Sequence, residues 1–184
     1  MGQAARVQRV SFDEYLTLAD RSDVRHELVD GEVFAMTGAT RRHATVVLNL
    51  AVRVRAALRG GRCTVYVNDV MVRTPTDDAF YPDVVVTCDE RDTHPRWIRH
   101  PSVVVEVLSE STATYDRAQK FDSYRTLESL REYVLVDPDR IAVDVFRRAD
   151  EGWTFEPLRD GDLVLSTLGV TISLHDLYEG LPDE

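Results

Sequence analysis

Residues 102–109 read SVVVEVLS, a run that is apolar at nearly every position but carries an acid, Glu106, near its end. A similar run, PDVVVTCD, occupies residues 82–89. Short apolar runs of this kind are typical of strands that are covered on both faces. We therefore expect these two segments to form the centre of a β-sheet.

Three further segments have the pattern of helices. A short helix is expected over 11–20, where Ser11 and Glu14 form a capping-box pattern. Apolar residues at helical spacing predict the longest helix over 41–59, which a pair of glycines ends, and another helix over 114–129. These helices would lie before and after the two central strands.

The remaining segments have the pattern of strands. Residues 25–36 alternate around Asp30-Gly31, a strong signal for a turn between two paired strands. Further strands are expected in 63–68, 70–74, 132–138, 140–149, 153–158 and 163–174, the last two at an edge. Helices and buried strands in this order indicate an α/β fold (an α+β mixed sheet), with helices flanking a central mixed β-sheet and an N-terminal β-hairpin.

The size and composition fit one globular unit. The chain has 184 residues and is 43% hydrophobic, so we expect a single domain over 1–184. It shows no leader-like apolar stretch near its start and no run of about 18 apolar residues, which predicts a soluble, cytoplasmic protein without a membrane segment. Cys63 and Cys88 lie far apart in apolar contexts without CxxC spacing, so we interpret them as buried, reduced thiols.

The net charge of −10 argues against strong nonspecific attraction to nucleic acid. The charge is unevenly spread, however. Residues 38–73 contain seven arginines and one acid, whereas residues 149–184 contain nine acids and one arginine. The first stretch predicts either a usable basic surface or a solvated helix face studded with arginines.

Two acids occupy positions where an apolar residue is expected. Alternation along the strand places Glu106 on the same face as Val104 and Leu108, and an unpaired carboxylate buried there would cost several kcal/mol. Asp83 opens the neighbouring strand after Pro82. Acids at the ends of adjacent central strands form an oxygen-rich site of the kind that Mg²⁺ accepts.

Lys120 is the only lysine in the chain, which otherwise uses arginine for positive charge. A lysine is a compact point charge that fits beside a metal ion and a nucleophilic water, whereas arginine is a wide planar fork. A helix that follows the second strand could bring this ammonium over the two acids. Ordinary alternatives remain open: a turn role for Asp83, an arginine partner for Glu106, and an exposed pair between Lys120 and Asp116.

The succession of HELVDGEVFAM (26–36), YPDVVVTCD (81–89), SVVVEVLS, DRAQKFDSY (116–124) and EYVLVDP (132–138) resembles the Uma family of restriction endonucleases, members of the P-D…(D/E)-x-K nuclease superfamily. The resemblance covers about residues 10–180. It implies a restriction endonuclease-like core and a cytoplasmic homodimer that acts on nucleic acid, in particular DNA.

The resemblance also implies site residues. Asp83, Glu106 and the backbone carbonyl of Val107 would be the metal ligands, with Lys120 and Glu27 as further catalytic residues. The superfamily lysine lies two residues after the second acid, but that position here is Leu108, so Lys120 is interpreted as a migrated lysine. Supporting contacts are expected from Asp116, Arg117, Tyr124 and His43, although His43 is also well placed to serve the start of its helix.

The expected activity is hydrolysis of phosphodiester bonds with Mg²⁺, or with Mn²⁺ in its place. Nucleic acid could approach over residues 91–100, where three arginines surround Trp97, although such a Trp also commonly covers the edge of a core. Three alternatives differ in class: a catalytically silent nucleic-acid- or protein-binding module, a metal-dependent hydrolase of smaller phosphate esters, and a structural homodimer. The specificity for a cleavage site does not follow from the sequence.

Overall fold

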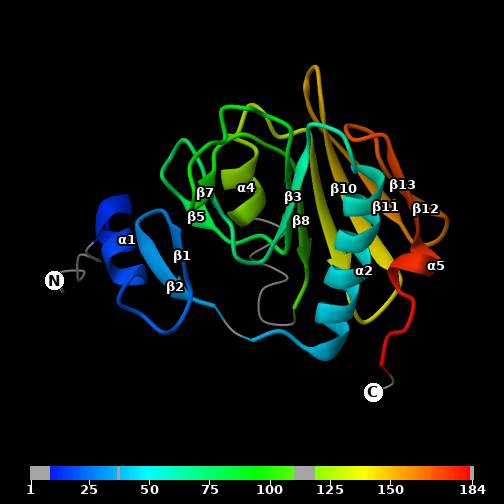
Figure 1. Ribbon diagram of the computed structural model, residues 1–184, viewed down its shortest axis with the longest axis horizontal. Coiled ribbons are helices and arrows are strands. Elements are labelled where there is room, and N and C mark those ends of the chain that lie inside the picture. Colours follow the sequence, from blue (N-terminus) through cyan, green and yellow to red (C-terminus); the bar gives the residue numbers. More distant parts are fainter. Residues whose placement is uncertain (1–8, 37, 110–118, 183–184) are drawn as a thin grey trace, which may run out of the picture.

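A computed structural model describes residues 9–36, 38–109 and 119–182 (Figure 1). Its centre is a six-stranded sheet in the order β11-β10-β9-β8-β6-β3. Only β8 and β9 pair in parallel, and the other neighbours are antiparallel. The strands are β3 (Thr64–Val67), β6 (Val84–Thr87), β8 (Pro101–Val107), β9 (Glu132–Asp137), β10 (Ala142–Ala149) and β11 (Gly152–Leu158). The two apolar runs therefore form neighbouring central strands, as predicted.

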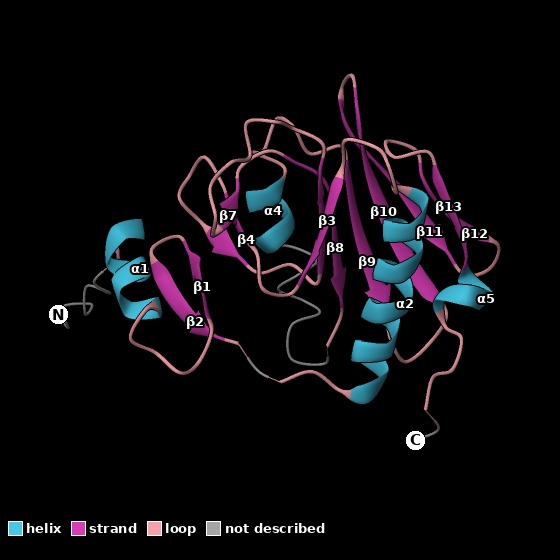
Figure 2. Cartoon of the chain, viewed as in Figure 1, coloured by secondary structure: helices cyan, strands magenta, loops and turns pink. Residues whose placement is uncertain are grey.

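Two smaller sheets accompany the large one (Figure 2). A five-stranded sheet has the order β2-β1-β5-β4-β7, and a separate hairpin pairs β12 with β13. The edge strand expected over 163–174 is thus a hairpin of its own. The bounds are β1 (His26–Val29), β2 (Glu32–Ala35), β4 (Met71–Arg73), β5 (Ala79–Phe80), β7 (Trp97–Ile98), β12 (Asp162–Leu165) and β13 (Val170–Ser173).

Four described helices complete the fold: α1 (Phe12–Ala19), α2 (Arg41–Ala57), α4 (Phe121–Tyr124) and α5 (Leu174–Leu177). One face of the large sheet is buried under α2, α5 and the β12–β13 hairpin, with Leu50 and Val105 in the shared core. The other face is buried under α4 and strands of the smaller sheet, with Tyr124 and Val104 in that core. A third, smaller cluster lies between α1 and the five-stranded sheet. This mixed α/β arrangement agrees with the predicted fold class.

Local sequence signals predicted the N-terminal elements well. The Ser11 hydroxyl accepts a hydrogen bond from the Glu14 amide, and the Glu14 carboxylate accepts one from the Ser11 amide, so the capping box is complete. The turn between β1 and β2 contains Asp30 with φ 48° and Gly31 with φ 78°. Positive φ at both central residues is the requirement of a tight hairpin turn, which explains the Asp-Gly pair.

The prediction of a helix over 114–129 is wrong at its C-terminal end, because α4 ends at Tyr124. Residues 110–118 lie outside the described part of the chain. Beyond α4 the chain forms tight turns that bury Leu127 and Leu130. The Arg148 guanidinium donates hydrogen bonds to three carbonyls of residues 125–130, at 2.7–2.9 Å. A distant strand thus provides the hydrogen bonds that a continuing helix would have made itself.

The prediction of two reduced thiols is also wrong, because Cys63 and Cys88 form a disulfide. The residues following and preceding them, Thr64 and Thr87, are paired partners in β3 and β6. The cysteines therefore sit opposite each other at the strand ends, with Cα atoms 4.1 Å apart. Their 25-residue separation concealed this contact, which exists only because the two strands pair.

Three of the seven arginines in the stretch 38–73, namely Arg42, Arg53 and Arg73, contact acids or carbonyls of the described chain. Arg53 on α2 pairs with Asp176 and Glu179, at 3.6 and 3.2 Å, and Arg42 donates to the carbonyl of Pro182 at 3.0 Å. The acidic C-terminal part thus lies against the basic helix. Among the helices of the described chain, none has both the length and the apolar character needed to cross a membrane.

Candidate active site

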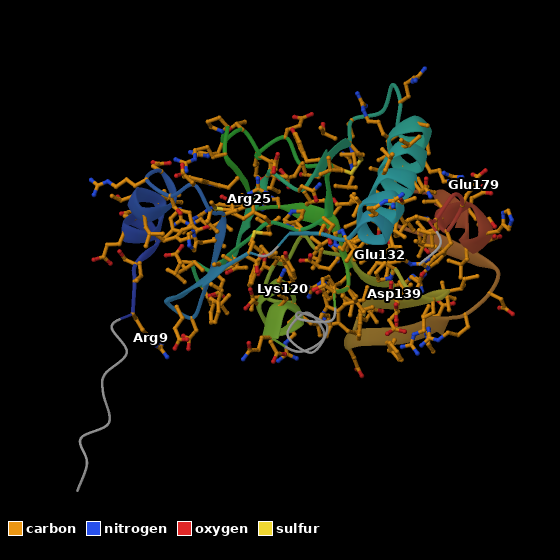
Figure 3. All side chains as sticks on the ribbon, turned by 90° about the horizontal axis from the view of Figure 1, so that it is seen from below. Arg9, Arg25, Lys120, Glu132, Asp139 and Glu179 are labelled. Atoms are coloured by element: carbon orange, nitrogen blue, oxygen red, sulfur yellow. A yellow bond between two sulfur atoms is a disulfide. The ribbon has the colours of Figure 1, made fainter. Side chains whose placement is uncertain are left out.

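A cavity of about 840 Å³ lies where β1, β6, β8 and α2 meet. Its lining includes the four residues Glu27, Asp83, Glu106 and Lys120, together with a further carboxylate, Asp69. Figure 3 shows Lys120 near the middle of the molecule, between the N-terminal hairpin and α2. The four residues predicted to be catalytic therefore converge on one cavity, although they come from four separate segments.

Asp83 and Glu106 are brought together by the pairing of β6 with β8. Val84 is paired with Val105, so the residue before β6 and the residue after Val105 stand side by side at one end of these antiparallel strands. The Asp83 carboxylate accepts a hydrogen bond from the Val107 amide at 2.7 Å. Because this hydrogen bond joins the start of β6 to the end of β8, it fixes the position of the Asp83 carboxylate at that edge of the sheet.

The imidazole of His43 meets the same carboxylate. His43 Nε2 lies 3.3 Å from Asp83 Oδ2, and both side chains are mostly buried. The start of α2 is instead capped by Thr40, whose hydroxyl accepts a hydrogen bond from the His43 backbone amide. The His43 side chain therefore contacts the predicted metal ligand, and its backbone serves the helix terminus.

Glu106 is buried with an exposed fraction of 3%, and it has cationic and neutral donors beside it. Its Oε1 lies 3.3 Å from Lys120 Nζ and accepts a hydrogen bond from the Tyr124 hydroxyl at 3.0 Å. The counter-charge that the sequence required is thus Lys120. Among the described residues, no arginine forms an ion pair with Glu106.

Glu27 completes the cluster from the smaller sheet. Its Oε1 lies 3.0 Å from Lys120 Nζ and accepts a hydrogen bond from the Tyr81 amide at 3.2 Å. The Lys120 ammonium consequently lies between two buried carboxylates. Two acids and one cation leave this cluster with a net negative charge when all three groups are ionised.

Burial and the neighbouring carboxylate Glu106 raise the pKa of Tyr124 well above its usual value. Desolvation is the larger cause, because the charged phenolate would be removed from water and placed beside an anion. Tyr124 therefore stays protonated at any ordinary pH. Its hydroxyl acts as a permanent hydrogen-bond donor to Glu106.

Asp78 holds the segment that carries Lys120. Its Oδ2 accepts a hydrogen bond from the Ser123 hydroxyl on α4 at 2.8 Å, and its Oδ1 accepts one from the Asp30 amide at 2.8 Å. The carboxylate is 7% exposed and therefore connects α4 to the β1–β2 turn through the interior. Sequence reasoning did not single out Asp78, because its position after Asp77 between two short strands is typical of a turn.

The oxygen donors at this site fit a hard cation such as Mg²⁺. Asp83 and Glu106 stand at the same end of adjacent strands, and Val107 contributes to the lining. Within the described part of the chain, no group of three or more His, Cys, Asp or Glu side chains is arranged to hold a metal. Such a site would therefore depend on two carboxylates, a main-chain carbonyl, water and substrate oxygens, which Mg²⁺ tolerates.

The remaining predicted residues have different outcomes. Asp116 and Arg117 lie outside the described residues. In the segment 91–100, Trp97 packs edge-on against Phe12, with ring centroids 5.4 Å apart, and so covers the edge of the third cluster. The cavity lining formed by described residues contains no part of that segment.

Comparison with known proteins identifies relatives along nearly the whole chain. The chain is 34% identical to the uncharacterized protein slr1290 of Synechocystis sp. over 182 residues, which cover 97% of this chain and 96% of that protein. It is 30% identical to a second uncharacterized Synechocystis protein, sll1609, over 150 residues, covering 79% and 85% of the two chains.

A solved structure has the same fold. It is the crystal structure of "a putative nuclease belonging to DUF820" from Anabaena variabilis, with a TM-score of 0.75 and 17% sequence identity over 94% of this chain and 99% of that chain. A family model described as "Uma2: Putative restriction endonuclease" matches residues 12–176. That match includes Glu27, Asp83, Glu106 and Lys120 of the cavity, and the chain therefore belongs to the Uma2 family.

Proposed function

We propose that this protein is a Mg²⁺-dependent endonuclease that hydrolyses phosphodiester bonds of DNA. The observation that carries the proposal is the position of the Lys120 ammonium, 3.0 Å from Glu27 and 3.3 Å from Glu106 in the cavity that also contains Asp83. Membership of the Uma2 family and the nuclease-like fold support the same class of reaction.

Each residue of the cluster has a distinct part in the proposed reaction. Asp83, Glu106 and the Val107 carbonyl would hold Mg²⁺ or Mn²⁺, which when bound lowers the pKa of a coordinated water and polarises the phosphate. Lys120 orients the attacking water and stabilises the negative charge that develops on the phosphate, a contribution typically worth about 3 kcal/mol for one well-placed donor. Glu27 holds the ammonium in place.

Neighbouring side chains keep the two ligands oriented. Tyr124 donates a hydrogen bond to Glu106, and His43 contacts Asp83. Such outer contacts commonly change metal affinity or activity by about 10- to 100-fold when they are removed. We further propose, as the family resemblance implied, that the enzyme is cytoplasmic and works as a homodimer. Sedimentation of the purified protein would measure the homodimer, and cell fractionation would measure the location.

Substitution of the cluster tests the proposal. Lys120→Ala, Asp83→Asn and Glu106→Gln should each reduce nicking of supercoiled plasmid in Mg²⁺ by at least about 100-fold. Glu132→Gln is a matched control, because Glu132 is also a buried, ion-paired glutamate of the same sheet but contacts Arg147. That variant should retain its turnover at temperatures where it is folded.

Two measurements separate the alternatives. Calorimetric titration with Mg²⁺ and Mn²⁺ should show binding that is lost in Asp83→Asn, whereas absence of binding at millimolar concentrations would favour a silent binding module. Competition between plasmid DNA and small phosphate esters should show preference for DNA. If all three cluster variants nick plasmid as fast as wild type does, the assignment of these residues as catalytic is wrong.

A further inference from the structure

Three large apolar side chains that line the cavity are partly exposed to solvent, and the proposed hydrolysis gives them no role. Phe34 from β2, Leu48 from α2 and Val67 from β3 all line the cavity. Their exposed fractions are 43%, 62% and 42%. Large apolar side chains that gather around an opening beside a cluster of charged groups indicate a binding surface.

The aromatic ring of Phe34 lies next to the charged cluster. Phe34 is paired directly with Glu27 in the β1–β2 hairpin, so their side chains lie on the same face of that sheet. Glu27 in turn lies 3.0 Å from the Lys120 ammonium. A ligand group stacked on the ring would therefore be adjacent to a phosphate held at the carboxylates.

The charges around the cavity do not favour a DNA duplex. Apart from His43, the described lining contributes two basic side chains, Arg25 and Lys120, and both form ion pairs with carboxylates. Affinity for duplex DNA comes mainly from several basic groups that neutralise phosphates. The described part of the lining therefore offers a ligand more apolar contact than phosphate neutralisation.

An unpaired nucleobase has the chemistry that fits the apolar side. Every base has a flat face that stacks on aromatic rings, and such stacking tolerates different sequences. A volume of about 840 Å³ is in the range of clefts that enclose a ligand of nucleotide size. A base inside a duplex cannot reach this wall unless it is unpaired or flipped out, which costs energy.

We propose that the Phe34 wall, defined as Phe34, Leu48 and Val67, binds an unpaired base next to the phosphate that is cleaved. The preferred substrates are then single-stranded or flap-containing nucleic acid, which should be cut faster than intact duplex. This inference rests on the proposed nuclease activity. It adds the class of substrate to that function.

Labelled oligonucleotides of one sequence test this preference as a single strand, as a blunt duplex and as a duplex with a single-stranded flap. The single strand and the flap should have the higher kcat/KM. Phe34→Ala should raise KM for them by about 5- to 150-fold, the factor expected for one lost stacking contact. Phe34→Tyr keeps the ring and should behave as wild type.

Phe155→Ala is the matched control, because Phe155 is a comparably exposed phenylalanine, 56% accessible, on the edge strand β11. It should leave KM unchanged. A second test removes the base in place of the ring: a strand with an abasic site at the position that contacts Phe34 is bound to wild-type protein. Its affinity should be as low as that of the normal strand for Phe34→Ala. The two losses should not add, because both remove the same contact.

Binding without turnover makes the test independent of catalysis. Fluorescence anisotropy in EDTA should show that Phe34→Ala weakens binding of the single strand, and this result would support the inference even if no oligonucleotide were cleaved. Cleavage that prefers blunt duplex and ignores Phe34→Ala would overturn the inference while sustaining the nuclease. If Phe34→Ala instead dissociates a dimer and leaves strand binding intact, the wall is a subunit contact and the inference fails.

Discussion

Replacing Lys120 by Met separates the structural role of the ammonium from its proposed chemical role. Methionine has a similar length and fills the same space without the charge. The substitution leaves Glu27 and Glu106 without the cation that lies 3.0 and 3.3 Å from their Oε1 atoms. All three side chains are at most 7% exposed, so water cannot replace the lost partner cheaply.

The magnitude follows from these distances. At an effective dielectric constant of about 20, two unit charges separated by 3.0–3.3 Å attract by roughly 5 kcal/mol. Part of that attraction is offset by the desolvation of the charges, and removal of one partner from a buried pair typically costs about 3–5 kcal/mol. We therefore expect Lys120→Met to lower the free energy of unfolding by about 3–5 kcal/mol.

Urea denaturation followed by tryptophan fluorescence measures this loss, which should shift the midpoint by about 1–2 M without changing the slope. Arg9→Ala is the control, because Arg9 forms a bidentate pair with Asp30 at 2.7 Å on the surface and should cost less than about 1 kcal/mol. Adding Glu27→Gln to Lys120→Met should restore part of the loss. Equal effects of Lys120→Met and Arg9→Ala would refute the assignment of Lys120 as the buried counter-charge.

Three further substitutions test the supports of the site. Tyr124→Phe removes the 3.0 Å hydrogen bond to Glu106 and should lower the free energy of unfolding by about 1–3 kcal/mol. It should also slow plasmid nicking in single-turnover experiments, and an unchanged rate would exclude a positioning role for Tyr124. Asp78→Asn weakens the hydrogen bond from Ser123 on α4 and should slow nicking about tenfold or more. Calorimetry should show an unchanged Mg²⁺ affinity, whereas a parallel loss of affinity would indicate general unfolding. Replacement of Cys63 and Cys88 by Ser should lower the free energy of unfolding by roughly 3.5 kcal/mol for a 25-residue separation, and dithiothreitol should have the same effect on wild type but none on the variant.

The central part of the site was predictable because it depends on local alternation and on strand order. The apolar run around Glu106 fixed which face the carboxylate shares with Val104 and Leu108, and both residues lie in the core cluster on that face. The requirement that a buried carboxylate has a counter-charge then pointed to a nearby cation. The strand pairing in the structure brings Asp83 to the same end of the sheet.

The remaining features depend on contacts that local patterns do not report. The turns after α4 are held by Arg148 on β10, which lies 18 to 23 residues after the carbonyls that it contacts. Asp78 acts through Ser123, which is 45 residues away. The disulfide requires the pairing of β3 with β6. Each of these contacts arises only after the sheets are assembled, so single-segment reasoning extended the helix too far, did not single out Asp78 and interpreted the cysteines as free thiols.

The contact between α2 and the end of the chain has a consequence for handling the protein. Asp176 and Glu179 act as counterions for Arg53, and the Asn49 amide donates to the carbonyls of Leu177 and Glu179. A chain shortened before Asp176 would leave Arg53 without these two counterions and Arg42 without the Pro182 carbonyl. Such a truncation should attract polyanions more strongly, so ionic-strength titrations on shortened chains would overstate the electrostatic attraction of the full chain to any polyanion.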